Sequence, residues 1–402
     1  MNLVFVTLSR IRGIEARGIY TDLMREFRDQ GHNVYIVTPY ERRFGLQTSL
    51  KEVDGVHILG VKTLNIQKTN VVEKGIGTIM LERQLKRAVA RYLSDVHFDL
   101  ILYSTPPITF TGVIKYLKQQ NPKAVSYLLL KDIFPQNAVD LEMFSKNSIF
   151  YKYFRAKEIN LYKLSDYIGC MSPANVEFLL KYNPYVDKNR VEVAPNTISL
   201  VDNRPAVDKN AVRQKYGLPT DKPIFIYGGN LGKPQGVDYL LKCMEANMNR
   251  EDCYFVIVGG GTEFGKIEAW YKEHHSANIS LFSALPKEEY DKLVASCDVG
   301  LIFLDHRFLI PNFPSRLLSY LENKMPIIAA TDVHCDMGYI AEQNHFGYWC
   351  ESVNPEDFTV CINKFIENQA DLSKMGDNGY DFLLANYQTC FTYNKICSHL
   401  NA

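Results

Sequence analysis

The chain has 402 residues, of which 46% are hydrophobic and 22% charged, with 45 basic and 45 acidic side chains. This length is ample for two buried cores. The zero net charge argues against a nucleic-acid-binding protein, since such proteins are typically strongly basic. The nine cysteines form no CxxC pair and no metal-ligand spacing. This argues against a disulfide framework or a zinc site and favours reduced, cytosolic thiols. No apolar run approaches the roughly 18–20 residues that span a bilayer, so any membrane contact is expected to be peripheral.

In the first half of the chain, apolar runs alternate with helical patterns. Residues 2–8 predict a strand, because this run is too short for a signal peptide. A loop with Gly13 and Gly18 then leads into a helix over 19–30. The alternation continues, as is typical of a parallel α/β sheet. An amphipathic helix is expected over 78–94, and further strands over 33–39, 53–61, 98–107, 124–136, 167–172 and 191–196.

Polar side chains follow two of these strands. Ser104 and Thr105 come at the end of one strand, and Lys131 and Asp132 at the end of the next. Open α/β sheets bind their ligands at the carboxyl ends of the strands, so all four residues are candidates for a site. Lys131 and Asp132 can equally form a structural pair.

Residues 199–220 break the hydrophobic pattern with charges and prolines, which predicts a domain boundary. A second series of alternating strands and helices follows it. We therefore expect a first domain over 1–198 and a second over 199–386. Residues 387–402 are expected to form a terminal helix or tail that packs back on the first domain.

The stretch Phe303–Asp332 predicts a strand, a loop, a helix and a second strand. Pro314 suits the start of the helix, so Ser315 and Arg316 lie at a helix N-terminus, which attracts anions. The planar guanidinium of Arg316 is suited to phosphate. Glu322, about two turns further on, is able to accept hydrogen bonds from sugar hydroxyls. The alternative is a capped structural helix whose charged side chains are simply solvated.

A glycine-rich loop, IYGGNLGKPQG (226–236), lies between a predicted strand and a helix. Its Gly229 allows a ligand to approach the backbone, and Lys233 is nearby. The loop is a poor match to the dinucleotide fingerprint GxGxxG. Together with VGGG (258–261) and PSR (314–316), however, it predicts a nucleotide-diphosphate site. The chain has no DxD motif, so Arg316, Lys233 and helix N-termini are expected to supply the positive charge, with no metal ion.

Over essentially its whole length, the sequence resembles the glycosyltransferase family 4 enzymes, which have the GT-B fold of two Rossmann-like domains facing a central cleft. It is most similar to a bacterial subgroup that builds capsule and O-antigen repeat units, some of whose members transfer N-acetyl-L-fucosamine. The matching segments are GHNVYIVTPYERR (31–43), KDIFPQNAVDL (131–141), YGGNLGKPQG (227–236), VGGG (258–261) and IPNFPSRLLSYLE (310–322).

The resemblance implies a role for several residues. Glu322 matches the last Glu of the family's E-x7-E motif, which holds the ribose, and Ser315 and Arg316 match the segment near the diphosphate. Asp132 falls near the acceptor-side catalytic position. Leu285, with its neighbours Ala284 and Pro286, matches the turn whose backbone reads uracil. Gly13 and Gly18 lie in the loop that faces the donor phosphates and the acceptor, and Gly229 and Gly260 lie in the matched glycine-rich loops.

The chain departs from the family pattern at three positions. The first Glu of E-x7-E is replaced by Pro314, and the common Arg and Lys of the phosphate loop fall on Asn230 and Gln235. These departures weaken the transfer of the phosphate contacts and of the family's retaining stereochemistry to this chain.

The resemblance implies a hexosyltransferase that moves a sugar from UDP to an undecaprenyl-diphosphate-linked sugar. The UDP-sugar is then the donor substrate, and no cofactor is required. Such an enzyme works in the cytoplasm, peripherally on the inner face of the cell membrane. Two alternatives remain open: a UDP-sugar 2-epimerase of the same fold, and a catalytically silent UDP-sugar-binding subunit of a partner transferase.

A membrane contact is also suggested by the charge of the first half. Residues 1–198 carry 27 Lys and Arg against 19 Asp and Glu, a balance of +8. On a helix, residues 146–164 place Lys152, Arg155 and Lys163 opposite an apolar arc, although Lys157 intrudes on that arc. Aromatic side chains flanked by basic ones are typical of an interfacial helix on an anionic membrane, whereas the alternative is a core helix packed on the sheet. The arc consists of Ile149, Phe150, Tyr153, Phe154, Leu161 and Leu164.

Overall fold

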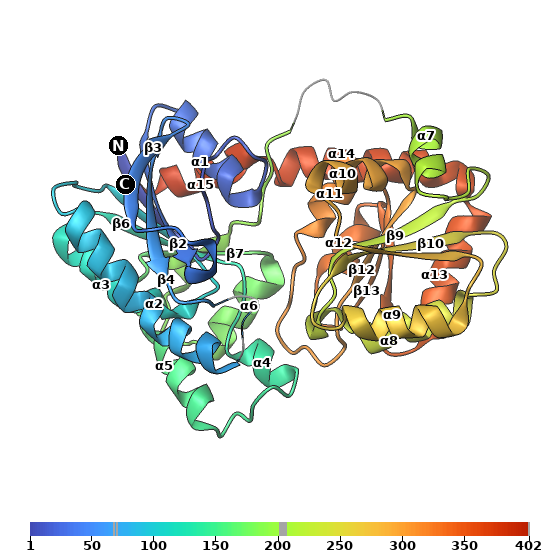
Figure 1. Cartoon of the computed structure of the whole chain (residues 1–402), viewed down its shortest axis with the longest axis horizontal. Helices are drawn as coiled ribbons and strands as arrows, with labels where there is room; N and C mark the ends of the chain where they lie inside the picture. Colours follow the sequence, from blue (N-terminus) through green and yellow to red (C-terminus); the bar gives the residue numbers. More distant parts are fainter. Residues whose placement is uncertain (67–68, 70, 201–206, 401–402) are drawn as a thin grey trace. The chain divides into compact units, whose positions relative to one another are not determined.

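The computed structural model describes residues 1–66, 69, 71–200 and 207–400 (Figure 1). The chain divides into two compact units. The first consists of Met1–Ser199 with Tyr387–Ala402, and the second of Leu200–Asn386. Each unit is built on a sheet whose strands are mostly parallel, with helices packed against it.

The sheet of the first unit has the order β3-β4-β2-β1-β5-β6-β7-β8. Its inner strands are buried nearly throughout, as in a parallel sheet that helices cover on both faces. The strands are β1 (Asn2–Val6), β2 (Asn33–Glu41), β3 (Ser49–Val53), β4 (Val56–Thr63), β5 (Leu100–Ser104), β6 (Val125–Leu130), β7 (Tyr167–Cys170) and β8 (Val191–Val193).

The strand expected over 53–61 is in fact part of an antiparallel hairpin of β3 and β4. The strands are joined at Asp54 and Gly55, whose φ angles are 55° and 73°. Two consecutive positive φ angles are typical of the tight turn that suits the twist of a hairpin. The Asp-Gly pair therefore explains why this edge of the sheet departs from the parallel pattern.

Helices pack on both faces of the first sheet (Figure 1). On one face, α1 contributes Phe27 and α15 contributes Ile396 to the same buried cluster. Tyr393 of α15 lies edge-on to Phe27, with ring centres 4.9 Å apart, so the C-terminal helix is part of this unit. The helices are α1 (Ile19–Asp29), α2 (Val71–Tyr92), α3 (Thr111–Gln120), α4 (Gln136–Asp140), α5 (Ile149–Leu164), α6 (Pro173–Tyr182) and α15 (Thr389–Ser398).

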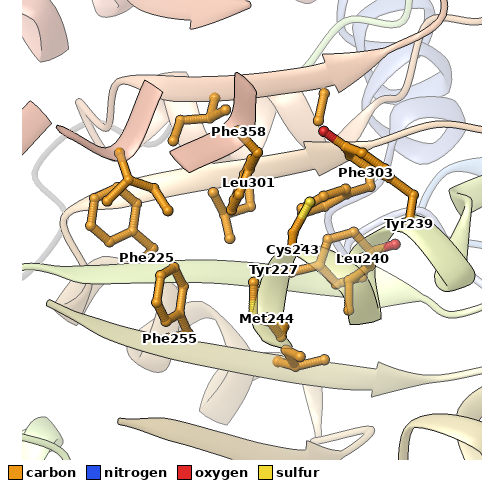
Figure 2. Close-up of a cluster of buried hydrophobic side chains, with 14 of the residues drawn as sticks. Phe225, Tyr227, Tyr239, Leu240, Cys243, Met244, Phe255, Leu301, Phe303 and Phe358 are labelled. Carbon is orange, nitrogen blue, oxygen red and sulfur yellow. The ribbon is translucent and has the colours of Figure 1, made fainter. Parts of the chain in front are cut away.

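The second unit has a parallel six-stranded sheet with the order β11-β10-β9-β12-β13-β14. Figure 2 shows its core, in which Phe225, Phe255 and Phe303 pack against helical residues such as Leu240 and Phe358. The strands are β9 (Ile224–Asn230), β10 (Tyr254–Gly260), β11 (Ile279–Ser283), β12 (Val299–Phe303), β13 (Ile327–Thr331) and β14 (Gly347–Glu351).

Eight helices of the second unit lie among its described residues, and one of them falls in the expected linker. This helix, α7 (Lys209–Lys215), is capped by the Asp208 side chain and held by an ion pair of 2.6 Å between Arg213 and Asp298. It was not predicted because polar contacts rather than an apolar face anchor it. The others are α8 (Val237–Asn247), α9 (Phe264–His274), α10 (Lys287–Ser296), α11 (Arg316–Glu322), α12 (Met337–Gln343), α13 (Pro355–Glu367) and α14 (Leu372–Asn386).

In the part of the chain that the structure describes, no helix is both long and apolar enough to cross a membrane.

Candidate functional site

In the second unit, the loops that follow β9 and β10 interlock. The backbone N–H of Leu231 donates to the carbonyl of Gly260 (3.0 Å), and that of Glu263 donates to the carbonyl of Leu231 (2.9 Å). A Cβ atom on Gly259 would lie only 1.9 Å from the carbonyl oxygen of Gly229. Glycine is therefore needed where the two strands end, and it brings both loops to one edge of the sheet.

Arg316 is the charged centre of this edge. It opens α11 behind Ser315, as predicted, and its guanidinium carbon lies 4.2 Å from the ring centre of Tyr227. A Cβ on Gly229 would lie 3.4 Å from Nη2 of Arg316, and Gly229 has a φ of 127° that only glycine readily adopts. The chain is thus shaped to let the guanidinium lie directly beside the glycine loop.

Among the described residues, no carboxylate forms an ion pair with Arg316. Its Nη1 atom is buried and has no hydrogen-bond partner among the described residues. Tyr290 lies close by, and burial raises the pKa of its phenol to about 12, so this neighbour is neutral at physiological pH. Tyr320 is occupied, since its hydroxyl donates to the carbonyl of Ile226 (3.1 Å). An anion that accepts from the guanidinium would remove an unsatisfied buried donor.

The two residues that replace the family's Arg and Lys bind each other. The side-chain amide of Asn230 donates to Oε1 of Gln235 (2.8 Å), and the same oxygen accepts from the backbone N–H of Gly232 (3.1 Å). Lys233, by contrast, is exposed at the start of a short 3-10 turn. Asn230 and Gln235 therefore shape the loop, and Lys233 is a solvent-exposed charge next to it.

Leu285 lies in the turn between β11 and α10, next to the VGGG loop. A Cβ on Gly260 would lie 3.7 Å from the Cβ of Ala284. Since β11, β10, β9 and β12 are parallel neighbours, the predicted residues Gly229, Gly260, Leu285, Ser315 and Arg316 all lie at the carboxyl edge of one sheet.

Sequence reasoning missed an ion pair in the loop that follows β12. Asp305 is buried and accepts from Nε (2.9 Å) and Nη2 (2.8 Å) of Arg307. Burial tends to raise the pKa of this carboxyl, but the bonds from Arg307 outweigh it and the pKa is lowered. Among the described residues, no group of three or more His, Cys, Asp or Glu side chains is placed to hold a metal ion.

The structure does not bring Glu322 to this edge. Glu322 is the last residue of α11, about 9 Å along the helix axis from Arg316 at a rise of 1.5 Å per residue. Because α11 connects two parallel strands, its last turn lies toward the amino end of β13, which begins at Ile327. Ser319, one turn after Arg316, lies about 4.5 Å nearer to the start of α11 than Glu322 does.

This geometry changes the expectation for Glu322. A ribose contact would make Glu322→Gln cost roughly 1.5–3 kcal/mol of UDP binding, the range for hydrogen bonds to charged groups. Because Glu322 lies at the far end of α11, we expect calorimetry on Glu322→Gln to show less than about a twofold change in UDP affinity. This is well below the tenfold change that corresponds to about 1.4 kcal/mol. A tenfold loss of affinity would restore the ribose assignment.

In the first unit, Asp132 is held at the carboxyl end of β6. Nδ2 of Asn137 donates to both of its carboxylate oxygens (2.8 and 3.0 Å), and Thr105 accepts from the backbone N–H of Lys131 (3.0 Å). Burial raises the pKa of Asp132 to about 6, although Asn137 lowers it. At neutral pH the carboxylate is thus ionised but close to its pKa, which suits a general base.

Lys131 and Asp132 do not form an ion pair among the described residues. Nζ of Lys131 instead donates to the carbonyl of Ala194 (2.8 Å), and burial lowers the pKa of the amine to about 7. Ser104 lies beside the first strand, with its Oγ 3.3 Å from Oγ1 of Thr7. Thr105 and Asn137 therefore hold Asp132 in place, and Lys131 does not neutralise its charge.

Gly13 and Gly18 lie in the loop between β1 and α1, which surrounds a cavity of about 760 Å³. A Cβ on Gly13 would lie 2.6 Å from Oδ2 of Asp54, so glycine lets the loop fold against the β3–β4 turn. Gly18 is the N-cap residue of α1 and supplies no side-chain cap.

Three comparisons relate the chain to known proteins. Residues 208–382 match the family model described as glycosyl transferases group 1. WbjE of Pseudomonas aeruginosa, named as a probable glycosyltransferase, is 24% identical over 306 residues, which cover 76% of this chain and 73% of that protein. WcaI of Escherichia coli K12 carries the name of a colanic acid biosynthesis glycosyl transferase. It is 25% identical over 138 residues, 34% of this chain and 33% of its own length.

The fold has a counterpart among solved structures. Anabaena HepE in complex with UDP-glucose is 14% identical and superposes with a TM-score of 0.71, covering 100% of this chain and 99% of its own. The expected fold and enzyme class are confirmed. The group 1 match, these relatives and the two α/β units identify the chain as a glycosyltransferase with the GT-B fold.

Proposed function

We propose that this glycosyltransferase moves a sugar from UDP to a lipid-diphosphate-linked saccharide during assembly of a bacterial capsule or O-antigen. The observation that carries the proposal is Arg316 beside the glycine loops, whose buried Nη1 atom has no hydrogen-bond partner in the part of the chain that the structure describes. A diphosphate provides the acceptor oxygens that this guanidinium needs. The UDP-glucose held by HepE and the colanic acid pathway in the name of WcaI support the donor and pathway classes.

On the donor side, the leaving UDP gains negative charge as the glycosidic bond breaks. Preorganised donors aimed at such charge are usually the largest catalytic term. Arg316 and the loop N–H groups provide this charge stabilisation, Lys233 adds a flexible charge, and the turn at Leu285 receives the base. We propose that these groups act without a metal ion, because the chain lacks a DxD motif. The donor sugar proposed is an N-acetylated one such as N-acetyl-L-fucosamine, as in family 4 relatives.

On the acceptor side, Asp132 is the group placed to meet the attacking hydroxyl. If the reaction inverts the anomeric centre, the Asp132 carboxylate accepts the proton of that hydroxyl. If the reaction retains it, a phosphate oxygen of the donor takes the proton, and Asp132 orients the acceptor sugar.

The acceptor is lipid-linked, so we propose that the first unit docks on an anionic membrane through the start of α5. Ile149 and Phe150 are 83% and 67% exposed, and Lys146 and Lys152 lie next to them in the chain. Exposed apolar side chains flanked by lysines suit the interface of an anionic bilayer. Ile76 of α2 is also exposed, and α2 is joined to α5 by the ion pair between Glu82 and Lys157 (2.7 Å).

Most of the remaining arc expected on α5 does not face outward, although Tyr153 is exposed. The ring of Phe154 packs edge-on against Phe134, with centres 4.9 Å apart, and Leu161 is buried. Arg155 is also internal, since it pairs with Glu158 and donates to Asn183 (2.6 Å). Only the first turns of α5 are therefore available for a membrane, and Arg155 is excluded from the docking set.

The membrane contact predicts that Ile149→Ser/Phe150→Ser and, separately, Lys146→Glu/Lys152→Glu abolish flotation with vesicles rich in anionic lipid. Each lysine near an anionic surface contributes about 1 kcal/mol, so wild-type binding should also fall at high salt. Both variants should keep their affinity for UDP. The control is Tyr339→Ser/Val360→Ser, which removes exposed apolar side chains of the second unit and should leave flotation intact. Wild-type protein that ignores anionic vesicles at low salt would exclude this contact.

The reaction class is tested by a screen of UDP-sugars, read as UDP release with and without a lipid-linked acceptor. A transferase releases UDP only when the acceptor is present. Conversion of the UDP-sugar to its 2-epimer without an acceptor would instead identify an epimerase. UDP binding with neither product would identify a silent subunit.

A further inference from the structure

Asn137 is the side chain that binds the carboxylate of Asp132, and the proposed function assigns it no part in the reaction. It lies on α4, and its Nδ2 atom donates to Oδ1 of Asp132 at 2.8 Å and to Oδ2 at 3.0 Å. One amide nitrogen thus bridges both carboxylate oxygens. This contact fixes the rotation of the carboxylate, while each oxygen keeps a lone pair for a further donor.

The backbone of α4 holds Asn137 in this place. Its N–H donates to the carbonyl of Ile133 (3.1 Å), and its own carbonyl accepts from the N–H of Leu141 (3.2 Å). Ala138 and Leu141 on the same helix are buried. The amide is therefore presented to the carboxylate by a packed turn of the chain that begins directly after Asp132.

The other end of the Asn137 amide is left unsatisfied. Its Oδ1 atom is buried and has no hydrogen-bond partner among the residues that the structure describes. A buried acceptor without a partner is unfavourable, so a residue kept only for stability is expected to satisfy both ends of its amide. The arrangement instead favours the carboxylate of Asp132 at the expense of the amide.

The groups around Asp132 act on its ionisation in opposite directions. Burial raises the pKa of this carboxyl most. The amide of Asn137 and the backbone N–H of Ile133 lower the pKa, and the charge of Glu158 on α5 raises it. Glu158 is itself paired with Arg155. Among the side chains, Asn137 is therefore the one that favours the ionised form of Asp132.

The nearest cation does not take over this task. The amine of Lys131, next to Asp132 in the chain, donates to the carbonyl of Ala194 (2.8 Å). A cation bound to the carboxylate would lower its pKa far below neutrality and weaken it as a base, whereas a neutral amide lowers the pKa only in part. An amide at this position thus suits a carboxylate that must both be ionised and accept a proton.

We propose that Asn137 is a positioning residue that acts through Asp132, holding this carboxylate oriented and ionised at neutral pH to meet the acceptor hydroxyl. The role of Asp132 as the base rests on the proposed function. The effect of Asn137 on the ionisation of Asp132 is a property of the free protein and is measured without turnover.

The first test is a pH titration of the Asp132 carboxyl carbon by NMR on the full chain, with the signal assigned by its absence in Asp132→Asn. Asn137→Leu is nearly the same size and removes the amide. The pKa of Asp132 should rise by about 1–2 pH units, as expected for a lost hydrogen bond to a charged group. The matched control on α4 is Gln136→Leu, which removes an amide that donates to Asp140 instead (2.7 Å). It should leave the pKa of Asp132 unchanged.

The second readout is the pH dependence of kcat/KM. The acidic limb expected near pH 6 in the wild type should move upward in Asn137→Leu. Its kcat/KM should then fall about tenfold at pH 6.5 and recover most of this loss at pH 9. A merely structural role would lower kcat/KM by the same factor at every pH. Asn137→Asp keeps the size of the side chain but adds a second carboxyl, so it should also move the limb upward. It provides the test if Asn137→Leu fails to fold.

An unchanged or lowered pKa of Asp132 in the folded Asn137 variants would overturn the proposal, and so would an equal loss of kcat/KM at every pH. A different outcome would contradict the proposed function alone. If the pKa rises as expected in the free protein but the wild type has no acidic limb in kcat/KM, Asn137 controls the ionisation of Asp132, and Asp132 is not the base.

Discussion

Replacing Arg316 with alanine is expected to lower kcat by about 10²–10³-fold, the loss typical of removing one preorganised donor to a developing charge. The guanidinium is held against Tyr227 beside the glycine loop, and its buried Nη1 atom has no partner among the described residues. Its full hydrogen bonding is therefore expected only with a bound anion. Lys233→Ala should cost much less, because Lys233 is exposed and a solvated lysine gains little from one contact.

A companion variant shows whether Arg316 serves the ligand or the fold. A buried donor without a partner costs about 1–3 kcal/mol, so Arg316→Met should keep or raise the melting temperature of the free protein while UDP affinity falls. The measurements are thermal unfolding and calorimetry on the same samples. A lower melting temperature together with unchanged UDP affinity would make Arg316 a structural residue. Equal, small kinetic losses in Arg316→Ala and Lys233→Ala would show that backbone groups alone bind the phosphates.

Asp132→Asn is expected to have the second large effect, a loss of about 10²–10⁴-fold in rate if the carboxylate is the general base. A base must be ionised to act, and the pKa of Asp132 is raised by burial to about 6. In the wild type, kcat/KM should therefore rise with pH through about 6 and then level off. The variant should lack this acidic limb. A variant that keeps the limb and shows only a raised KM for the acceptor would instead make Asp132 an orienting residue, as in the retaining mechanism.

Stability provides the control for this variant. The folded-state pKa of Asp132 lies above its ordinary value. Protonation of this carboxyl therefore stabilises the fold when the pH is below the ordinary pKa. This contribution is lost as the pH rises through about 6. Asparagine remains neutral throughout. Asp132→Asn should thus melt at a higher temperature than the wild type at pH 7.5 and at a similar temperature at pH 4, which would show that the lost activity is not lost folding.

The parts of the fold that follow from local pattern were predictable. The apolar strands β9, β10, β12 and β13 and the start of α11 at Arg316 lie where runs of buried residues, glycines and Pro314 placed them. The edge strand β14 was not predicted, because GYWCE is only partly buried and carries no strong alternation. Helix α7 was missed because a cap and an ion pair, rather than an apolar stripe, hold it.

The candidate site was predictable in its loops but not in its contacts. Spacing placed Gly229, Gly260 and Arg316 at one sheet edge, but Tyr227 as the support of Arg316 depends on how β9 and α11 pack together. Motif spacing alone also assigned Glu322 to the ligand, whereas the parallel crossover carries the end of α11 to the other edge of the sheet. The pairing of Asn230 with Gln235 likewise requires the loop to be seen folded.

The most direct test of this account is the mass of the lipid product after the purified enzyme, a UDP-sugar and a polyprenyl-diphosphate-linked saccharide are incubated together. The acceptor should gain the mass of one glycosyl residue with one UDP released per residue added, and Arg316→Ala should form this product about 10²–10³-fold more slowly. UDP release with an unchanged lipid, or an altered UDP-sugar and no new lipid species for any donor in the screen, would contradict it.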